Sequence, residues 1–153
     1  TQKNGLSEKP VIAILPGSRK QEISYILPLM INIKKHYPDH QFIVASAPAI
    51  DIEFYDTIIN KAEVSKLYNQ TYEILQHAKA ALVTSGTATL ETALLNIPQI
   101  VCYKFRGGGI IYNIGKLFLK VPYISLVNLI MNREIVKELI QQYLNFDELE
   151  QLH

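Results

Sequence analysis

Short apolar runs alternate with longer amphipathic stretches along the chain. The first apolar run covers residues 11–15 and ends at a Pro-Gly turn, and a second covers residues 41–45. Between them, at residues 22–37, apolar side chains recur at helical spacing. Strands that are apolar throughout are typical of a sheet buried on both faces. The pattern therefore predicts buried strands separated by helices.

The same alternation continues to residue 143. It predicts strands at residues 11–15, 41–45, 64–68, 80–84, 99–103 and 123–126, and helices at residues 22–37, 51–61, 72–78, 87–95, 110–119 and 133–143. Strands that alternate with helices in this way form a parallel sheet covered on both faces. The predicted fold class is α/β, a Rossmann-like, doubly wound parallel sheet of about six strands. Ligands of such sheets bind beyond the carboxyl ends of the strands.

The composition is that of one globular domain. Of the 153 residues, 48% are hydrophobic, which is enough to bury a full core. The single cysteine, Cys102, cannot form an internal disulfide, and the first residues lack the layout of a signal peptide. No apolar stretch reaches the length of about 18 residues that a transmembrane helix needs. We therefore expect a cytoplasmic domain at residues 11–153, preceded by a polar linker at residues 1–10.

The charge of the chain is nearly balanced. Fifteen basic and fourteen acidic residues give a formal net charge of +1. A net charge this small gives no overall positive potential that would attract nucleic acid. Any bound anion must therefore be held by a local site, and no nucleic-acid partner is expected.

The loop after the first strand has the features of an anion site. Gly17 lets the backbone approach a ligand, and Ser18 and Arg19 precede a helix whose first amides attract anions. The guanidinium of Arg19 suits phosphate oxygens. In the alternative interpretation, Ser18 caps the helix and Arg19 pairs with Glu22 or faces water. The loop is neither a Walker P-loop nor a GxGxxG motif, which argues against ATP and NAD.

Small residues also follow the strand predicted at residues 80–84. Ser85, Gly86 and Thr87 lie at a predicted helix start, where backbone amides suit a phosphate. Glu91 follows Thr87 by one turn on the same helix face, which places its carboxylate to accept hydrogen bonds from the hydroxyls of a ribose. The alternative is a capped amphipathic helix with a surface glutamate.

A third polar cluster follows the strand predicted at residues 123–126. Asn128, Asn132, Arg133 and Glu134 offer donors and acceptors for a sugar or a phosphate. Arg133 and Glu134 also fit the exposed start of a last helix. Because parallel strands end at the same edge of a sheet, the three loops are expected to lie together and to form a nucleoside-diphosphate site.

A stretch of mixed basic and apolar residues lies between residues 104 and 120. An apolar face flanked by basic side chains suits a helix that rests on an anionic membrane surface. A crossover helix packed on the sheet is the alternative. The candidate membrane contacts are Phe105, Arg106, Ile110, Ile111, Lys116 and Phe118.

Three segments together resemble the C-terminal half of the lipid-A-disaccharide synthases. They are LPGSRKQEI at residues 15–23, SGTATLETALLNIPQIVCYK at residues 85–104 and YISLVNLIMNREIVKELIQ at residues 123–141. Three motifs in the family's order, spread over nearly the whole chain, are much more specific than any one of them. The chain departs from the family's pattern at Val127, Met131 and Asn132, where a proline and smaller residues are expected.

The resemblance implies a role within a GT-B glycosyltransferase. Such an enzyme would transfer 2,3-diacylglucosamine from its UDP derivative to 2,3-diacylglucosamine 1-phosphate and release UDP, with no metal and no other cofactor. This chain would be the half that binds the UDP-sugar, working with an N-terminal domain that is absent from it. Carried over by position, the contacts would be Gly17, Ser18, Arg19, Ser85, Gly86 and Thr87 with the phosphates, Glu91 with the ribose, Tyr72 with the uracil, and Asn128, Arg133 and Glu134 with the donor sugar or its phosphate.

The resemblance also implies how the two halves would share the chemistry. Arg19 would stabilise the charge that grows on the leaving diphosphate. The catalytic base would lie in the N-terminal domain, because His36, His40 and His77 are expected at the surface, far from the three loops. The enzyme would be peripheral on the inner face of the inner membrane. The competing hypotheses are an enzyme like UDP-N-acetylglucosamine 2-epimerase and a non-catalytic, flavodoxin-like module.

Overall fold

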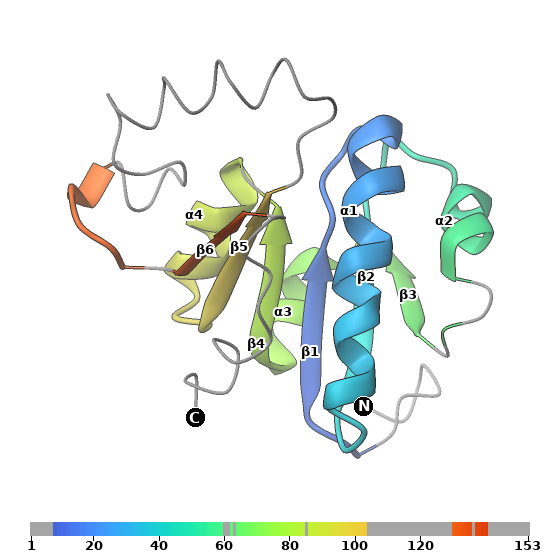
Figure 1. Cartoon of the computed structure of the whole chain (residues 1–153), viewed down its shortest axis with the longest axis horizontal. Coiled ribbons are helices and arrows are strands. Elements are labelled where there is room, and N and C mark those ends of the chain that lie inside the picture. The colour runs from blue at the N-terminus through green and yellow to red at the C-terminus, as the bar shows by residue number, and fades with distance from the viewer. Residues whose placement is uncertain are drawn as a thin grey trace.

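One parallel sheet forms the centre of the protein. The computed structural model describes residues 8–59, 62, 64–84, 86–103, 130–135 and 137–140. Its strands are β1 (Val11–Leu15), β2 (Gln41–Ser46), β3 (Ser65–Tyr68), β4 (Ala78–Thr84), β5 (Gln99–Tyr103) and β6 (Lys137–Ile140). They pair in parallel in the order β3-β2-β1-β4-β5-β6 (Figure 1). This order confirms the predicted doubly wound sheet, and the direction of winding reverses between β1 and β4.

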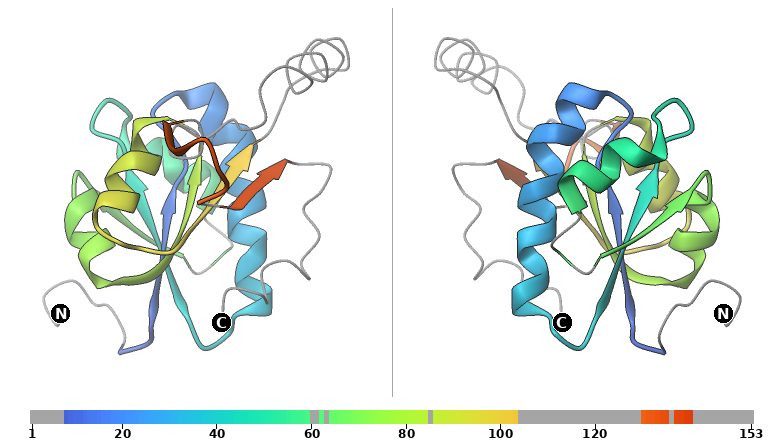
Figure 2. Two further views of the ribbon diagram at one scale, coloured as in Figure 1. Left: turned by 90° about the vertical axis from the view of Figure 1, so that its left-hand side faces the viewer. Right: turned by 90° about the vertical axis from the view of Figure 1, so that its right-hand side faces the viewer.

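Helices cover both faces of the sheet. They are α1 (Lys20–Asn32), the short 3-10 helix η2 (Ile33–His36), α2 (Ile52–Ile59), α3 (Thr71–His77) and α4 (Thr87–Leu94). Figure 2 shows α1 and α2 on one face and α3 and α4 on the other. The protein is therefore a three-layer α/β/α domain.

The apolar run of β1 is explained by these two layers. Ile12 and Ile14 belong to the core under α1 and α2, whereas Val11, Ala13 and Leu15 belong to the core under α3. Successive side chains of a strand point to opposite faces, so a strand covered on both sides needs apolar residues at every position. All five residues of β1 are buried accordingly.

The helical spacing of the first amphipathic stretch also has its expected cause. In α1, Ile23, Ile26, Leu27 and Met30 are at most 2% exposed and form one face against the sheet. The predicted helix at residues 22–37 is, however, two elements, because the α-helix ends at Asn32 and η2 continues it to His36.

The last predicted helix is wrong. Residues 133–143 were expected to be helical, but residues 137–140 form β6 and pair with β5 from Ile100 to Tyr103. A segment as short as four residues does not distinguish a strand from a helix by periodicity, and here pairing with a neighbouring strand decides the conformation. The strand predicted at residues 123–126 and the helix predicted at residues 110–119 lie outside the described residues.

The segment before β1 is held to the sheet. The backbone N–H of Gln41 donates to the Pro10 oxygen at 3.0 Å, and the Gln41 side-chain amide donates to the Lys9 oxygen at 2.9 Å. The Lys9 ammonium donates to the Pro38 oxygen at 2.9 Å. Residues 9 and 10, which were expected in a linker, thus already contact the start of β2.

Candidate functional site

The first two candidate loops begin side by side. Leu15 at the end of β1 pairs with Val83 near the end of β4, so the segments that follow these two strands leave the sheet at its carboxyl edge as neighbours. The first segment enters α1 and the second enters α4, on opposite faces of the sheet (Figure 1). The expectation that these two loops share an edge is confirmed, and the place where they meet is the switch point of the sheet.

Gly17 makes the closest approach in the first loop. Its φ is +98°, a conformation that residues with a side chain rarely adopt. A Cβ at this position would run into the Glu22 carboxylate and would lie 3.0 Å from the Thr84 methyl group. The backbone conformation therefore favours glycine, and a side chain here would also have to shift the Glu22 carboxylate and crowd the Thr84 methyl group.

The position of Gly86, in the second loop, favours glycine for a different reason, which is its backbone conformation alone. As the N-cap of α4 it has φ 132° and ψ −163°, a region that is essentially restricted to glycine. A Cβ placed there would meet nothing within 4 Å. The Gly86 oxygen accepts hydrogen bonds from the Thr89 N–H at 3.2 Å and the Thr89 hydroxyl at 2.8 Å, but no side chain of the described residues caps the first amides of the helix. Within the part of the chain that the structure describes, the amino end of α4 is uncapped, and Thr87 is exposed.

The two helix starts differ in charge. The first turn of α4 contains no acidic residue, whereas the first turn of α1 contains Glu22. A carboxylate in the first turn offsets the positive end of a helix dipole. The amino end of α4 is therefore the better place for a phosphate, and the loop before α1 contributes mainly through Arg19.

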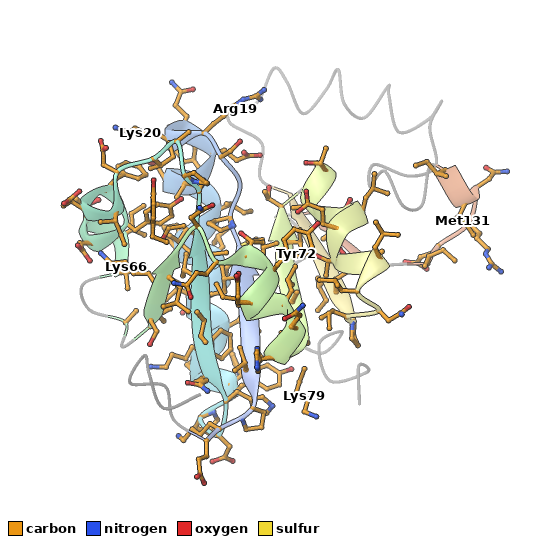
Figure 3. The ribbon with its side chains drawn as sticks, turned by 180° about the vertical axis from the view of Figure 1, so that it is seen from behind. Arg19, Lys20, Lys66, Tyr72, Lys79 and Met131 are labelled. Carbon is orange, nitrogen blue, oxygen red and sulfur yellow. The ribbon has the colours of Figure 1, made fainter. Side chains whose placement is uncertain are left out.

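Arg19 is available to a ligand. Its side chain is exposed, and no ion pair joins it to Glu22 in the described part of the chain. Arg19 is also the N-cap of α1, and no side chain caps that helix, so the alternative in which Ser18 is the cap is wrong. Figure 3 shows Arg19 at the carboxyl edge, pointing away from its neighbour Lys20, whose ammonium lies 3.7 Å from Asp51.

Two more predicted residues lie at the same edge. Glu91 is half-buried on α4, one turn beyond Thr87. Tyr72 is 55% exposed at the start of α3, which follows the carboxyl end of β3 (Figure 3). The edge therefore presents an uncapped helix start, a guanidinium, a carboxylate and an exposed aromatic ring.

The third loop is described only at residues 130–134. Arg133 and Glu134 precede β6, and no helix begins at them. Figure 3 shows Met131 well away from Arg19. Ser85 and Asn128, and all six candidate membrane contacts, lie outside the described residues.

Sequence reasoning missed one feature of the site. The Thr84 hydroxyl donates a hydrogen bond to the Glu22 carboxylate at 3.3 Å, which links the end of β4 to the first turn of α1. Glu22 was considered only as a partner of Arg19, and Thr84 only as the end of a strand. An acidic residue in the first turn after a glycine loop was the available signal, but its partner is 62 residues away.

The three described histidines lie at the other edge of the sheet. His36 and His40 precede β2, and His77 precedes β4, so all three are near the amino ends of strands. This position supports the expectation that they are far from the first two loops. His40, however, is half-buried and not a surface residue, and its Nδ1 is buried without a hydrogen-bond partner.

Cys102 is not a nucleophile in the folded protein. It is 2% exposed, and burial raises the pKa of its thiol to about 12. At pH 8 only about one thiol in ten thousand would then be a thiolate. We expect no measurable reaction of the native chain with an aromatic disulfide reagent at pH 8, and one thiol per chain after denaturation. Rapid reaction of the native chain would contradict this burial.

The described residues contain neither a metal-binding cluster nor a membrane-spanning helix. Among them, no group of three or more His, Cys, Asp or Glu side chains could hold a metal ion. No helix in the same part of the chain is long and apolar enough to cross a membrane.

Several known proteins are similar in sequence to this chain. The profile of the family described as lipid-A-disaccharide synthetase matches residues 2–153. The lipid-A-disaccharide synthase of Syntrophus aciditrophicus (strain SB) is 39% identical over an alignment of 137 residues, and the match covers 85% of this chain and 35% of that protein. That of Myxococcus xanthus (strain DK1622) is 38% identical over an alignment of 147 residues, and the match covers 92% of this chain and 38% of that protein. The chain thus spans little more than a third of the length of these relatives.

One solved structure is similar to part of this chain. The spinosyn rhamnosyltransferase SpnG complexed with thymidine diphosphate is 19% identical in sequence, with a TM-score of 0.45. The matched part covers 63% of this chain and 26% of the rhamnosyltransferase.

Proposed function

Because this chain belongs to the lipid-A-disaccharide synthetase family, we propose that it binds the UDP part of a UDP-sugar between β1 and β4. The observation that carries the proposal is the uncapped amino end of α4, which has no acidic residue in its first turn and has Arg19 across the switch point. Amides at a helix start and a guanidinium are complementary to a diphosphate. These two groups would offset the negative charge of the diphosphate without a metal ion.

Each residue at the edge then has a role in binding. The amides at Gly86 and Thr87 hold the phosphates together with Arg19, and Gly17 and Ser18 line the same loop. The Glu91 carboxylate, one turn beyond Thr87, accepts hydrogen bonds from the ribose. Tyr72, exposed at the start of α3, borders the uracil.

The proposed reaction is the inverting transfer of 2,3-diacylglucosamine from UDP-2,3-diacylglucosamine to 2,3-diacylglucosamine 1-phosphate. As the C1–O bond breaks, negative charge grows on the diphosphate. Arg19 and the amides of α4 would stabilise that charge, as preorganised dipoles do when they lower a barrier. The chain covers little more than a third of its relatives, so we assign the acceptor site and the catalytic base to the N-terminal domain of a GT-B enzyme.

The family supports two further assignments. We propose that Asn128, Arg133 and Glu134 approach the donor sugar or its phosphate. We also propose that Phe105, Arg106, Ile110, Ile111, Lys116 and Phe118 contact anionic lipid, which would hold the enzyme peripherally on the inner face of the inner membrane. The match over residues 2–153 favours this function over an epimerase-like enzyme or a flavodoxin-like module.

Calorimetry with UDP tests the site. Glu91→Ala is expected to weaken UDP binding about tenfold, because a hydrogen bond to a charged group contributes about 1.5 kcal/mol or more. UDP that lacks its ribose 2′-hydroxyl should bind the unmodified chain more weakly than UDP does. It should bind Glu91→Ala about as well as UDP does, because the carboxylate that distinguishes the two is gone.

Glu53→Ala is the matched control. It removes an exposed glutamate from the first turn of α2 and should leave UDP binding unchanged. If Glu91→Ala still distinguishes UDP from its deoxy form, the ribose role is wrong. If the unmodified chain does not bind UDP, the proposed function itself fails, and the flavodoxin-like module becomes the better hypothesis.

A further inference from the structure

We propose that Glu22 is a positioning residue of this site, a role that rests on the proposed function. Its carboxylate would hold the loop after β1 against the end of β4. Arg19 and the amides of α4 would then face the same ligand at a fixed separation.

The first observation is the contact between the two segments. The Thr84 hydroxyl donates to Glu22 Oε1 at 3.3 Å. Thr84 is the last residue of β4, is 5% exposed, and lies two positions before Gly86. A hydrogen bond between buried or half-buried groups is shielded from competition with water. This hydrogen bond therefore links the segment that leads into α4 to the first turn of α1.

The second observation is that Gly17 lies against the same pair. The position of its missing Cβ is occupied by the Glu22 carboxylate and approached by the Thr84 methyl group at 3.0 Å. Glu22 thus contacts both the loop at Gly17 and the end of β4 at Thr84. Three segments of the chain meet at this point: the loop after β1, the first turn of α1 and the end of β4.

The charge of Glu22 favours a positioning role over direct contact with the ligand. A carboxylate beside a diphosphate would repel it, whereas a carboxylate in the first turn of a helix is stabilised by the dipole. The described part of the chain shows no ion pair between Glu22 and Arg19, so the guanidinium is left for the ligand. Glu22 would therefore act through the geometry of the two loops.

Loss of this link should weaken binding by loss of preorganisation. A ligand that must first bring two mobile loops together binds more weakly than one that meets them already in place. Glu22→Ala and Thr84→Val should each weaken UDP binding about tenfold, and the double variant should be no weaker than either single one. Glu22→Gln and Thr84→Ser keep an acceptor and a hydroxyl, so they should bind within about threefold of the unmodified chain.

The experiment is calorimetric titration of UDP into the 153-residue chain and these variants, with thermal unfolding of each. Thr84→Val retains the shape of the side chain, so it keeps the test decisive if Glu22→Ala does not fold. Glu53→Ala is again the control for removing a first-turn carboxylate. In a chain that already carries Arg19→Ala, adding Glu22→Ala should weaken UDP binding by less than about threefold, because the group that Glu22 positions is absent.

The outcomes separate the two hypotheses. If the unmodified chain does not bind UDP, the proposed function fails. If it binds UDP but Glu22→Ala and Thr84→Val bind equally well or more tightly, the positioning role is wrong and the carboxylate only repels the ligand. If Glu22→Gln is as weak as Glu22→Ala, the charge matters and not the hydrogen bond, which also overturns the inference.

Discussion

Gly17→Ala is expected to lower the melting temperature by roughly 5–8 °C and to remove measurable UDP binding. A φ of +98° costs a residue with a side chain about 1–3 kcal/mol. The added methyl group would also displace the Glu22 carboxylate and press on the Thr84 methyl group. A total of about 2–3 kcal/mol corresponds to this shift in a domain of this size. Circular dichroism during heating and calorimetry with UDP measure the two effects.

Gly86→Ala separates backbone strain from lack of space. Its backbone is also in a region for glycine, but a Cβ there meets nothing within 4 Å. The melting temperature should therefore fall less than in Gly17→Ala. Adding Glu22→Ala to Gly17→Ala should recover part of the lost stability, because it removes the atoms that the new methyl group meets. Equal melting temperatures for the two glycine variants would show that the contact with Glu22 is unimportant.

Four of the first five strands, β1, β2, β4 and β5, were predictable because they are mostly apolar and mostly buried. A run such as Val11–Leu15, apolar at every position and closed by a Pro-Gly turn, fits a strand covered on both faces. The loops after β1 and β4 could be found in the same way, because the carboxyl edge of a parallel sheet is where ligands bind. Their meeting at the switch point follows from the strand order, which the alternation of elements implied but did not specify.

β6 was not predictable by the same means. β6 has only four residues, and two of them, Lys137 and Glu138, are charged. Neither strand nor helix is excluded by such a pattern, and the pairing with β5 is a contact between residues about 37 positions apart in the chain. The error concerns the third loop, because Arg133 and Glu134 precede a strand and do not begin a helix.

The link between Glu22 and Thr84 shows a second limit of sequence reasoning. A glutamate in the first turn of a helix is favourable without any ligand, so its presence indicates nothing by itself. Its importance depends on which atoms lie beside it. The same residue also resolves an ambiguity, because its charge makes the start of α1 a poorer place for phosphate than the start of α4.

Arg19→Ala should weaken UDP binding about 100-fold. A guanidinium that donates two charge-assisted hydrogen bonds to phosphate contributes up to about 3 kcal/mol. Arg19 is exposed at the switch point, and no described carboxylate pairs with it, so its full charge is available to the ligand. Arg19→Lys should recover only part of the affinity, because a lysine ammonium lacks the planar fork. Calorimetry at one fixed salt concentration measures all three chains.

Lys20→Ala and uridine provide the two controls for this effect. Lys20→Ala removes the same charge one residue away, but its ammonium pairs with Asp51 and lies 5.5 Å from the Phe54 ring, away from Arg19 (Figure 3). It should change UDP affinity less than about threefold, since an exposed charge at a distance is largely screened by salt. Uridine has no phosphate, so it should bind the unmodified chain and Arg19→Ala equally. If Lys20→Ala weakens UDP binding as much as Arg19→Ala does, the general charge of the edge holds the diphosphate and Arg19 has no specific role.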